Sequence, residues 1–208
     1  MAPGEPFSQR RIGLTGGIAS GKSSVGHWLA QQGLPVLDAD QFAREALAPG
    51  RPATTSVMQR YGARVQAEGS AAVDRAALGR IVFQDPAERR WLEQLIHPIV
   101  RERFDQELSL HANKPAVVLM IPLLFEAGLE SLCSEIWLVD CDESQQLQRL
   151  IARDGLGPEA AQARIAAQWP LSRKRVLADQ VLANRSQPGD WQAQAMDLLN
   201  ATGEVMPG

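Results

Sequence analysis

The segment Gly-Gly-Ile-Ala-Ser-Gly-Lys-Ser at residues 16–23 constrains the fold of this chain more than any other. It matches the pattern G-x-x-x-x-G-K-[ST] at every fixed position. A short apolar run around Ile12 and Leu14 precedes it, and a helical pattern from Ser23 to Gln32 follows. A loop that binds phosphate requires this order of strand, loop and helix, because glycine lets the backbone curl until its N–H groups point inward. We therefore predict an α/β domain that binds the phosphates of ATP or GTP; the alternative is a glycine-rich turn that only joins strand to helix.

Each part of this loop has an expected duty toward a nucleoside triphosphate. Lys22 brings a point charge to the β and γ phosphates, and the Ser23 hydroxyl is expected to bind Mg²⁺. The start of the following helix adds the positive end of its dipole. The predicted nucleotide-binding residues of the loop are Gly16, Gly17, Ile18, Ala19, Ser20, Gly21, Lys22, Ser23 and Ser24.

Further short apolar runs alternate with helical patterns along the chain. This alternation predicts a parallel sheet built through right-handed crossovers. The segment from Gln41 to His111 is almost wholly helical, with Asp74 as the expected N-cap of a helix from Arg75 to Phe83, so it reads as an insertion at the carboxyl edge of the sheet. The runs expected to form the remaining strands are 34–37, 116–121, 136–139 and 181–182, and the later helices are expected at 144–152 and 158–168.

Composition excludes several classes of protein. A chain of 208 residues, 45% of them apolar, is long enough for one compact α/β domain. Its net charge of -3 argues against a general nucleic-acid binder. Cys133 and Cys141 are too few for a disulfide scaffold or a zinc site, so we expect reduced thiols. The longest apolar run, 116–125, is far shorter than the roughly 20 residues of a membrane span, and no secretory signal is visible. We expect a soluble cytoplasmic protein without membrane or nucleic-acid partners.

Two carboxylates follow the second predicted strand. In an extended backbone, Asp38 and Asp40 would point to the same side, near the γ-phosphate. One could bind Mg²⁺ while the other accepts a hydrogen bond from an attacking hydroxyl group, as phosphoryl transfer requires. The alternative is that one aspartate caps the next helix and the other is solvated. This pair favours a kinase that acts on a small molecule.

A basic strip runs from Arg149 to Arg175. Arg149 and Arg153 lie four residues apart, on one face of a predicted helix. Charge on a transferred phosphoryl group needs a cationic clamp, and a mobile lid that carries arginine can supply it, with Gly155 and Gly157 as hinges. The alternative is a solvated helix face.

The main rival class is a P-loop GTPase that acts as a switch. Such a protein needs an Asn-Lys-x-Asp segment after a strand, whereas Asn113-Lys114-Pro115-Ala116 lacks the carboxylate and precedes a strand. Asp154-Gly155-Leu156-Gly157 fits the D-x-x-G of a switch loop, yet it follows a helix. We regard both matches as coincidental, and a nucleic-acid-stimulated ATPase is disfavoured by size and charge.

Taken together, the segments of this chain resemble the dephospho-coenzyme A kinase family from about Arg11 to Asn184. The order and spacing of the later segments are more specific than the loop, which many enzymes share. The segments that carry the resemblance are Leu14-Thr15-Gly16-Gly17-Ile18, Asp38-Ala39-Asp40 with Ala43-Arg44, Ile96-His97-Pro98, Ile121-Pro122-Leu123-Leu124-Phe125-Glu126, Arg149 with Arg153-Asp154, Gln168-Trp169-Pro170-Leu171 with Lys174, and Ala178-Asp179 leading to Asn184.

The resemblance implies a three-layer P-loop kinase fold: a parallel five-stranded sheet, an inserted helical substrate domain and a lid. It implies transfer from ATP, with Mg²⁺, to the 3′-hydroxyl of the ribose of dephospho-coenzyme A. Shikimate, gluconate or a nucleoside monophosphate are the alternative acceptors. We expect a loose extension at 1–10, a core at 11–40, 115–150 and 176–200, an insertion at 41–114, a lid at 151–175, a tail at 201–208, and a monomer or weak oligomer.

The resemblance also assigns roles to residues. The implied catalytic residues are Asp40, which orients the hydroxyl, with Lys22, Arg149 and Arg153. The implied acceptor side is formed by Asp40, Arg44, His97, Pro122, Leu123 and Leu124. Asn184 is expected where the family holds adenine, and Ser23 and Asp38 are expected at the metal.

For some of these residues a purely structural role is the alternative to a functional one. His97 before Pro98 could mark the end of one helix and the start of the next, and Pro122-Leu123-Leu124 could be a strand end turning into a core helix. The chain departs from the family at two positions, with Ala19 in place of glycine and Ser24 in place of threonine. Ala19 adds a methyl group where the backbone could require a positive φ.

Overall fold

The computed structural model describes residues 9–185 and 189–201, and this part of the chain divides into two compact units. One unit is formed by the segments before Asp38 and after His111, and the other is the segment Asp38–His111. Among the described residues, no helix combines the length and the apolar character that a membrane crossing demands.

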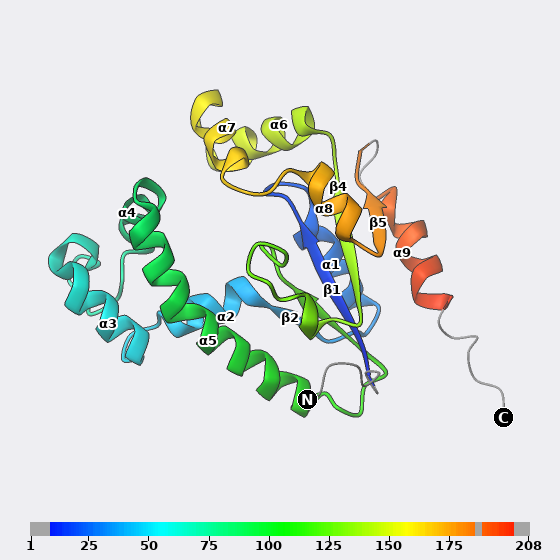
Figure 1. The fold of residues 1–208 in the computed structure, drawn as a ribbon, viewed down its shortest axis with the longest axis horizontal. Coiled ribbons are helices and arrows are strands. Elements are labelled where there is room, and N and C mark those ends of the chain that lie inside the picture. Colours follow the sequence, from blue (N-terminus) through cyan, green and yellow to red (C-terminus); the bar gives the residue numbers. More distant parts are fainter. Residues whose placement is uncertain (1–8, 186–188, 202–208) are drawn as a thin grey trace. The chain divides into compact units, whose positions relative to one another are not determined.

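The first unit is built on a five-stranded sheet with the order β2-β3-β1-β4-β5. The strands are β1 (Arg10–Gly16), β2 (Val36–Asp38), β3 (Ala116–Met120), β4 (Glu135–Asp140) and β5 (Gln180–Ala183). The pairs β1–β3, β1–β4 and β4–β5 are parallel, so the predicted α/β fold is confirmed. β1 is the central strand, with Leu14 opposite Met120 on one side and Gly16 opposite Val139 on the other. The glycine-rich loop therefore leaves the sheet from its middle, at the carboxyl edge (Figure 1).

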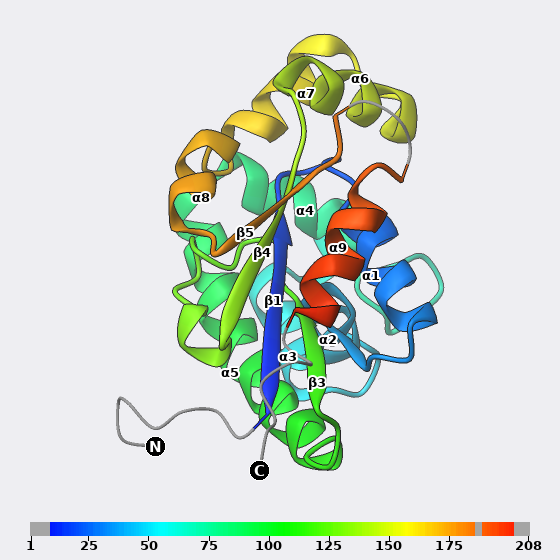
Figure 2. The ribbon, with the colours of Figure 1, turned by 90° about the vertical axis from the view of Figure 1, so that its right-hand side faces the viewer.

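One face of the sheet is covered by α1 (Lys22–Gln31) and α9 (Trp191–Asn200), as Figure 2 shows. Side chains of β1, β3, β4 and β5 form a core with Val25 and Leu29 of α1 and Trp191 of α9. Trp28 meets Trp191 edge to face, with 5.6 Å between the ring centroids. Trp28 thus packs α1 against α9, a helix that the sequence interpretation did not include.

The opposite face of β1 is packed so closely that it leaves no room for a side chain at Gly13. A Cβ atom there would lie 2.5 Å from Cys133 Sγ and 2.9 Å from Leu124 Cδ1. Cys133 directly follows the short 3₁₀ helix η2 (Glu130–Leu132). Because both faces of β3 and β4 are covered, their residues are almost all buried, which explains their continuous apolar sequences.

Three helices lie between β4 and β5 in the described sequence: α6 (Glu143–Asp154), α7 (Pro158–Ala166) and α8 (Leu171–Leu177). Helices α6 and α7 were predicted, with boundaries that differ by one or two residues. Gly155 ends α6 in the left-handed region, with φ of 65°, and Gly157 precedes α7. The helix α8 was not predicted.

The second unit consists of α2 (Ala39–Ala46), α3 (Pro52–Tyr61), η1 (Gly62–Val65), α4 (Arg75–Gln84) and α5 (Pro86–Leu110). The predicted cap of α4 is confirmed, because Asp74 accepts hydrogen bonds from the amides of Ala76 and Ala77. Residues from α3, η1 and α4, including Val57, form a separate core. The interpretation of His97 and Pro98 as a boundary between helices is wrong, since α5 runs through Pro98 for 25 residues.

The ends of the expected core fall at slightly different residues. β1 begins at Arg10, one residue before the expected start of the core, and Gln9 is already buried. Most of the expected loose extension (1–8) and of the expected tail (202–208) lies outside the described residues.

Candidate active site

The glycine-rich loop leads into a helix that begins without a side-chain cap. Gly21, with φ of 100°, precedes α1, which has no side-chain cap and no acidic residue in its first turn. The helices α2, α4 and α5 instead begin with an aspartate that accepts hydrogen bonds from their own amides. Since the first amides of a helix have no intrahelical partner, α1 can offer them to a phosphate.

Ala19 occupies a backbone region that glycine prefers. Its φ is 59°, and it is the one residue other than glycine with a positive φ in the described part of the chain. The suspected need for a positive φ at this position is therefore confirmed. A left-handed alanine costs roughly 1–2 kcal/mol relative to an ordinary conformation.

Three side-chain amides hold the loop around Ala19. The amide of Ile18 donates to Gln168 Oε1, and the carbonyl oxygen of Ile18 accepts from Gln146 Nε2, each at 2.8 Å. Asn184 Nδ2 donates to the carbonyl oxygen of Ser20, also at 2.8 Å. Asn184 was predicted near the nucleotide. Gln146 and Gln168 were not predicted as site residues, although the segment around Gln168 carries part of the family resemblance.

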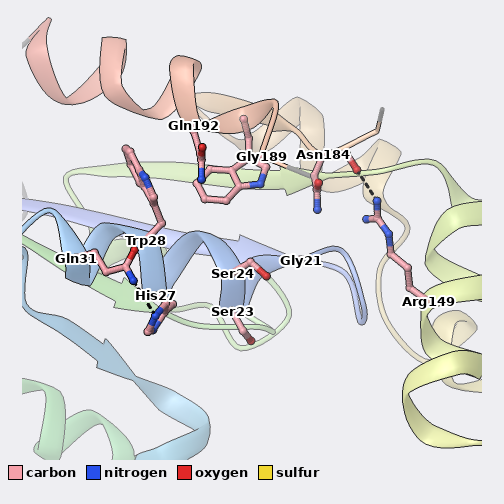
Figure 3. A pocket seen from close by; sticks show the side chains of 11 residues that line it. Gly21, Ser23, Ser24, His27, Trp28, Gln31, Arg149, Asn184, Gly189 and Gln192 are labelled. Carbon is pink, nitrogen blue, oxygen red and sulfur yellow. Dashed lines mark hydrogen bonds between the residues drawn. The ribbon is translucent and has the colours of Figure 1, made fainter. Parts of the chain in front are cut away.

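A pocket of about 720 Å³ opens beside the loop (Figure 3). Five predicted residues line it: Gly21, Ser23, Ser24, Arg149 and Asn184. The sequence interpretation missed the other lining residues, which are His27, Trp28, Gln31, Gly189, Trp191 and Gln192. Two tryptophan side chains with a few polar groups around them give the mixed lining that is typical of a site for a small organic molecule.

The two predicted lid arginines lie on α6 but have different partners. Arg149 Nη2 donates to the carbonyl oxygen of Asn184 at 3.1 Å, while its Nη1 is buried without a hydrogen bond. Arg153 is exposed, and its Nε lies 2.7 Å from Asp154 Oδ1. Asp154 also pairs with Arg164 at 3.0 Å. The hydrogen bond from Arg153 is the main reason why the pKa of Asp154 is lowered.

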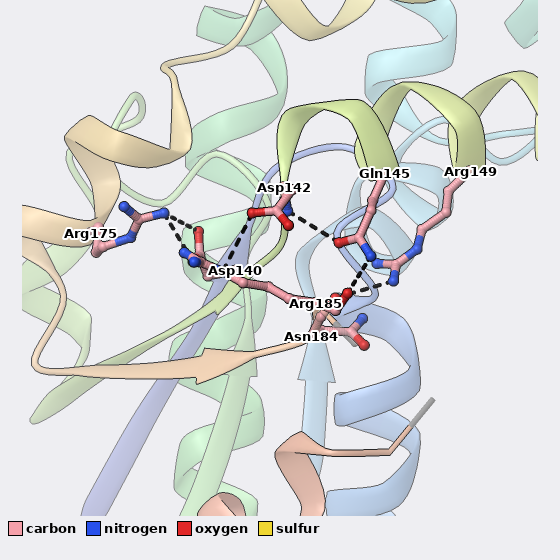
Figure 4. A network of polar contacts seen from close by, with 7 residues as sticks. All are labelled: Asp140, Asp142, Gln145, Arg149, Arg175, Asn184 and Arg185. Carbon is pink, nitrogen blue, oxygen red and sulfur yellow. Dashed lines mark hydrogen bonds and ion pairs between the residues drawn. The ribbon is translucent and has the colours of Figure 1, made fainter. Parts of the chain in front are cut away.

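A network of charges lies at the carboxyl end of β4 (Figure 4). Asp140 is fully buried and accepts hydrogen bonds from Arg175 and Arg185. The hydrogen bond to Asp140 is the main cause of the raised pKa of Arg185. Gln145 donates to the carbonyl oxygen of Arg185. Arg175, which the sequence placed in the basic strip, is thus tied to the edge of the sheet.

The predicted acceptor segment Pro122-Leu123-Leu124 follows β3 in the first unit. The carbonyl oxygen of Pro122 accepts hydrogen bonds from Thr15 Oγ1 at 3.2 Å and from Lys174 Nζ at 3.4 Å. Leu124 is fully buried in the core, whereas the side chain of Leu123 reaches solvent.

Lys174, on α8, is buried next to this segment. Its Nζ lies 2.8 Å from Glu126 Oε1, and its side chain is 0% exposed. Glu126 Oε1 also accepts a hydrogen bond from the amide of Trp169 at 3.1 Å. This pair joins α8 to the loop that carries Pro122.

The remaining predicted residues, Asp38, Asp40, Arg44 and His97, belong to the second unit. Asp38 Oδ1 accepts a hydrogen bond from the amide of Asp40 at 2.9 Å, and Arg44 lies 3.9 Å from Asp38 Oδ2. The expectation of an extended backbone through Asp38-Ala39-Asp40 is wrong, because α2 begins at Ala39. The alternative that one aspartate caps the helix is confirmed for Asp38. Asp40 and His97 are exposed, and their catalytic and binding roles stay predictions.

The central strand, its loop, the uncapped helix α1 and the adjoining pocket define a P-loop nucleotide-binding fold. A sequence model of the family described as "Dephospho-CoA kinase" matches residues 10–190. The chain belongs to this family, so the family and the kinase class predicted from the sequence are confirmed.

Individual relatives agree with this family. A protein named dephospho-CoA kinase from Synechococcus sp. (strain CC9605) is 85% identical over 199 residues, which cover 96% of each chain. The crystal structure of TT1252 from Thermus thermophilus has a TM-score of 0.83 and 35% identity, covering 97% of this chain and 100% of that one. Dephospho-CoA kinase from Campylobacter jejuni has a TM-score of 0.69 and 26% identity, covering 92% and 96% of the two chains.

Proposed function

We propose that this protein transfers the γ-phosphoryl group of ATP to the 3′-hydroxyl of the ribose of dephospho-coenzyme A, giving coenzyme A and ADP. Membership of the dephospho-CoA kinase family, at 85% identity to a curated member, carries the choice of acceptor. The uncapped amides of α1 beside a pocket of about 720 Å³ support the choice of a phosphate-bearing nucleotide as donor.

The pocket supports a place for the adenosine part of ATP. Asn184 lies between the loop and the pocket, because it contacts Ser20 and also lines the pocket wall. Trp28 and Trp191 contribute apolar rings to the lining of the pocket, and Gln31 and Gln192 contribute hydrogen-bonding groups. A purine, with flat faces and a polar edge, matches such a lining.

The residues of the loop fit a Mg²⁺ ion that arrives with the triphosphate. Ser23 is exposed in the first turn of α1, so its hydroxyl oxygen is available as a ligand. Mg²⁺ prefers oxygen ligands and is usually held by one or two protein groups together with phosphates and water. Asp38 stays the second proposed ligand; its Oδ1 accepts from the amide of Asp40, and its Oδ2 lies 3.9 Å from Arg44 Nη2. Bound there, the ion would neutralise charge on the phosphate oxygens.

The chain's own residues would act mainly by positioning. Lys22 and the amides of α1 hold the phosphates, and Arg149 offers its buried Nη1 to charge that spreads over the transferred group. Asp40 orients the acceptor hydroxyl and takes its proton as the new O–P bond forms and the bond to the ADP oxygen breaks. A carboxylate suffices for this, because bonding to the nucleophile is slight in a loose transition state.

A coupled assay of ADP release tests the acceptor. We expect turnover with dephospho-coenzyme A and only background rates with shikimate, gluconate or a nucleoside monophosphate. Turnover with one of those three and none with dephospho-coenzyme A would overturn the proposal.

The variant Asp40→Asn tests the role of the carboxylate. It keeps the size of the side chain but removes the proton acceptor, so transfer should be lost while ATP affinity stays within about twofold of wild type. An equal loss of ATP affinity would place Asp40 at the metal. Asp105→Asn, a change in an exposed residue of α5, is the matched control and should leave both quantities unchanged.

A monomeric state and a cytoplasmic location are part of the proposal and stay predictions. Light scattering coupled to size-exclusion chromatography checks the first: a mass near 22.7 kDa is expected.

A further inference from the structure

Two glutamine residues hold the same backbone unit of the phosphate-binding loop from opposite sides. Gln146 comes from α6, and Gln168 comes from the segment between α7 and α8. Together they satisfy both the N–H and the carbonyl group of Ile18. We propose that Gln146 and Gln168 are positioning residues that hold Ile18 and so keep Ala19 in the left-handed conformation required for nucleotide binding. This inference rests on the proposed function only in that the loop binds ATP.

The strain at Ala19 explains why such support is needed. A strained conformation persists only where its surroundings over-determine it. Ile18 precedes Ala19 and is held by the two glutamines, and Ser20 follows it and is held by Asn184 at 2.8 Å. The unfavourable residue is therefore fixed on both sides by side chains that come from elsewhere in the chain. Without them, Ala19 would gain by relaxing out of the left-handed region, and the loop amides would turn with it.

The approach of Gln146 depends on the absence of a side chain at Gly17. A Cβ atom at Gly17 would lie 2.4 Å from Gln146 Nε2, which is too close for any real contact. Gln146 is itself buried, with 4% of its surface exposed. Gly17 stands at a variable position of G-x-x-x-x-G-K-[ST], so phosphate binding alone does not require glycine there. The clamp by Gln146 supplies a physical reason for it.

The two contacts have opposite polarity. A backbone N–H can only donate, so Gln168 must present an acceptor; a carbonyl oxygen can only accept, so Gln146 must present a donor. Glutamate would keep the acceptor at position 168 but would lose the donor at position 146. The same substitution is therefore expected to have unequal effects at the two positions.

The first experiment measures binding of Mg-ADP to the full chain by calorimetry, without any acceptor. Gln146→Met and Gln168→Met keep the length of the side chain and remove its polar atoms. Each is expected to weaken Mg-ADP binding about tenfold, the effect of one lost hydrogen bond and the freed loop. Gln148→Met is the matched control, since Gln148 is exposed on the same helix as Gln146, and it should stay within about twofold of wild type.

A second set of variants separates positioning of the loop from a general loss of structure. Glycine adopts a positive φ at little cost. In the Ala19→Gly background, Gln146→Met should therefore weaken binding by less than about threefold. Gln146→Glu and Gln168→Glu add the same charge, and Gln168→Glu should bind Mg-ADP at least about fivefold more tightly than Gln146→Glu.

Three results would overturn the inference: Mg-ADP affinity within twofold of wild type in both methionine variants, a loss in Gln146→Met that Ala19→Gly leaves unchanged, or equal affinities in the two glutamate variants. Failure of the proposed function would look different. Wild-type protein would then bind Mg-ADP but would not phosphorylate dephospho-coenzyme A.

Discussion

The buried ion pair between Lys174 and Glu126 yields a sharp prediction for stability. Lys174 is completely buried, and its Nζ lies 2.8 Å from Glu126 Oε1, whose side chain is 16% exposed. Charges taken out of water depend on each other, so removal of one partner leaves the other buried and uncompensated. Such a loss typically costs about 3–5 kcal/mol.

The two single variants should differ in how much unfolding free energy they lose. Glu126→Gln leaves a fully buried ammonium group, whereas Lys174→Met leaves a carboxylate on a side chain that is 16% exposed and whose Oε1 keeps the hydrogen bond from the Trp169 amide. We therefore expect Glu126→Gln to lower the free energy of unfolding by about 4–5 kcal/mol and Lys174→Met by about 3 kcal/mol. At roughly 2–4 °C per kcal/mol for a chain of this size, the melting temperature should fall by about 6–20 °C. The loss of unfolding free energy in the double variant should be smaller, by at least about 2 kcal/mol, than the summed losses of the two single variants. The reason is that the double variant leaves no unpaired charge.

Urea denaturation, followed by circular dichroism, measures this coupling in a double-mutant cycle. The exposed pair Arg89 and Glu93 on α5, with its atoms 3.8 Å apart, serves as the control and should couple by about 0.5 kcal/mol or less. An additive double variant of Lys174 and Glu126, or a coupling no larger than that of the control, would refute the reasoning. Water would then hydrate the charged group that remains in each single variant.

Two further predictions concern groups with shifted pKa values. Hydrogen bonds from Arg60 and Tyr61 lower the pKa of Glu88 from 4.5 to about 2, so its contribution to stability is present above pH 4.5 and lost as the pH falls through about 2. The difference in unfolding free energy between wild type and Glu88→Gln should therefore shrink from pH 5 toward pH 2; a constant difference would contradict this. Burial raises the pKa of Cys133 to about 12, so at pH 8 a thiol reagent should label it far more slowly in native protein than in urea, and equal rates would refute its burial.

Much of the sheet could be predicted from the sequence, because buried parallel strands have continuous apolar sequences. This holds for β3 and β4, whose burial patterns are almost unbroken. The helix α8 gave no such signal. It has seven residues, and the one that is buried is Lys174, so no apolar stripe marks it. α9 did carry a signal, since Trp191 and Ala195 are spaced for one helix face, but the segment was not interpreted as a helix.

The site could be predicted where a fixed spacing encodes it and not where distant segments meet. The loop from Gly16 to Ser24 follows from its pattern. Gln146 and Gln168 contact Ile18 across separations of 128 and 150 residues, and a polar residue on a helix looks solvated from its sequence alone. Asp38 shows the opposite error: an aspartate at a strand end was interpreted as extended, whereas its carboxylate caps the helix that follows directly.

A count of the arginines in the basic strip overstates the positive charge that is available to bind a phosphoryl group. Arg153 and Arg164 share Asp154, and Arg175 shares the buried Asp140 with Arg185, so much of the positive charge is balanced locally. Arg173 lies over the ring of Trp169, 3.2 Å from its centroid. Arg149 differs, because its Nη1 is buried without a hydrogen bond and its side chain lines the pocket beside the loop. A buried donor that lacks a partner is costly unless a ligand satisfies it. The strip therefore serves two ends: Arg164 ties α7 to α6 and Arg175 ties α8 to β4, while Arg149, with its unpartnered Nη1, is the proposed contact to the phosphates.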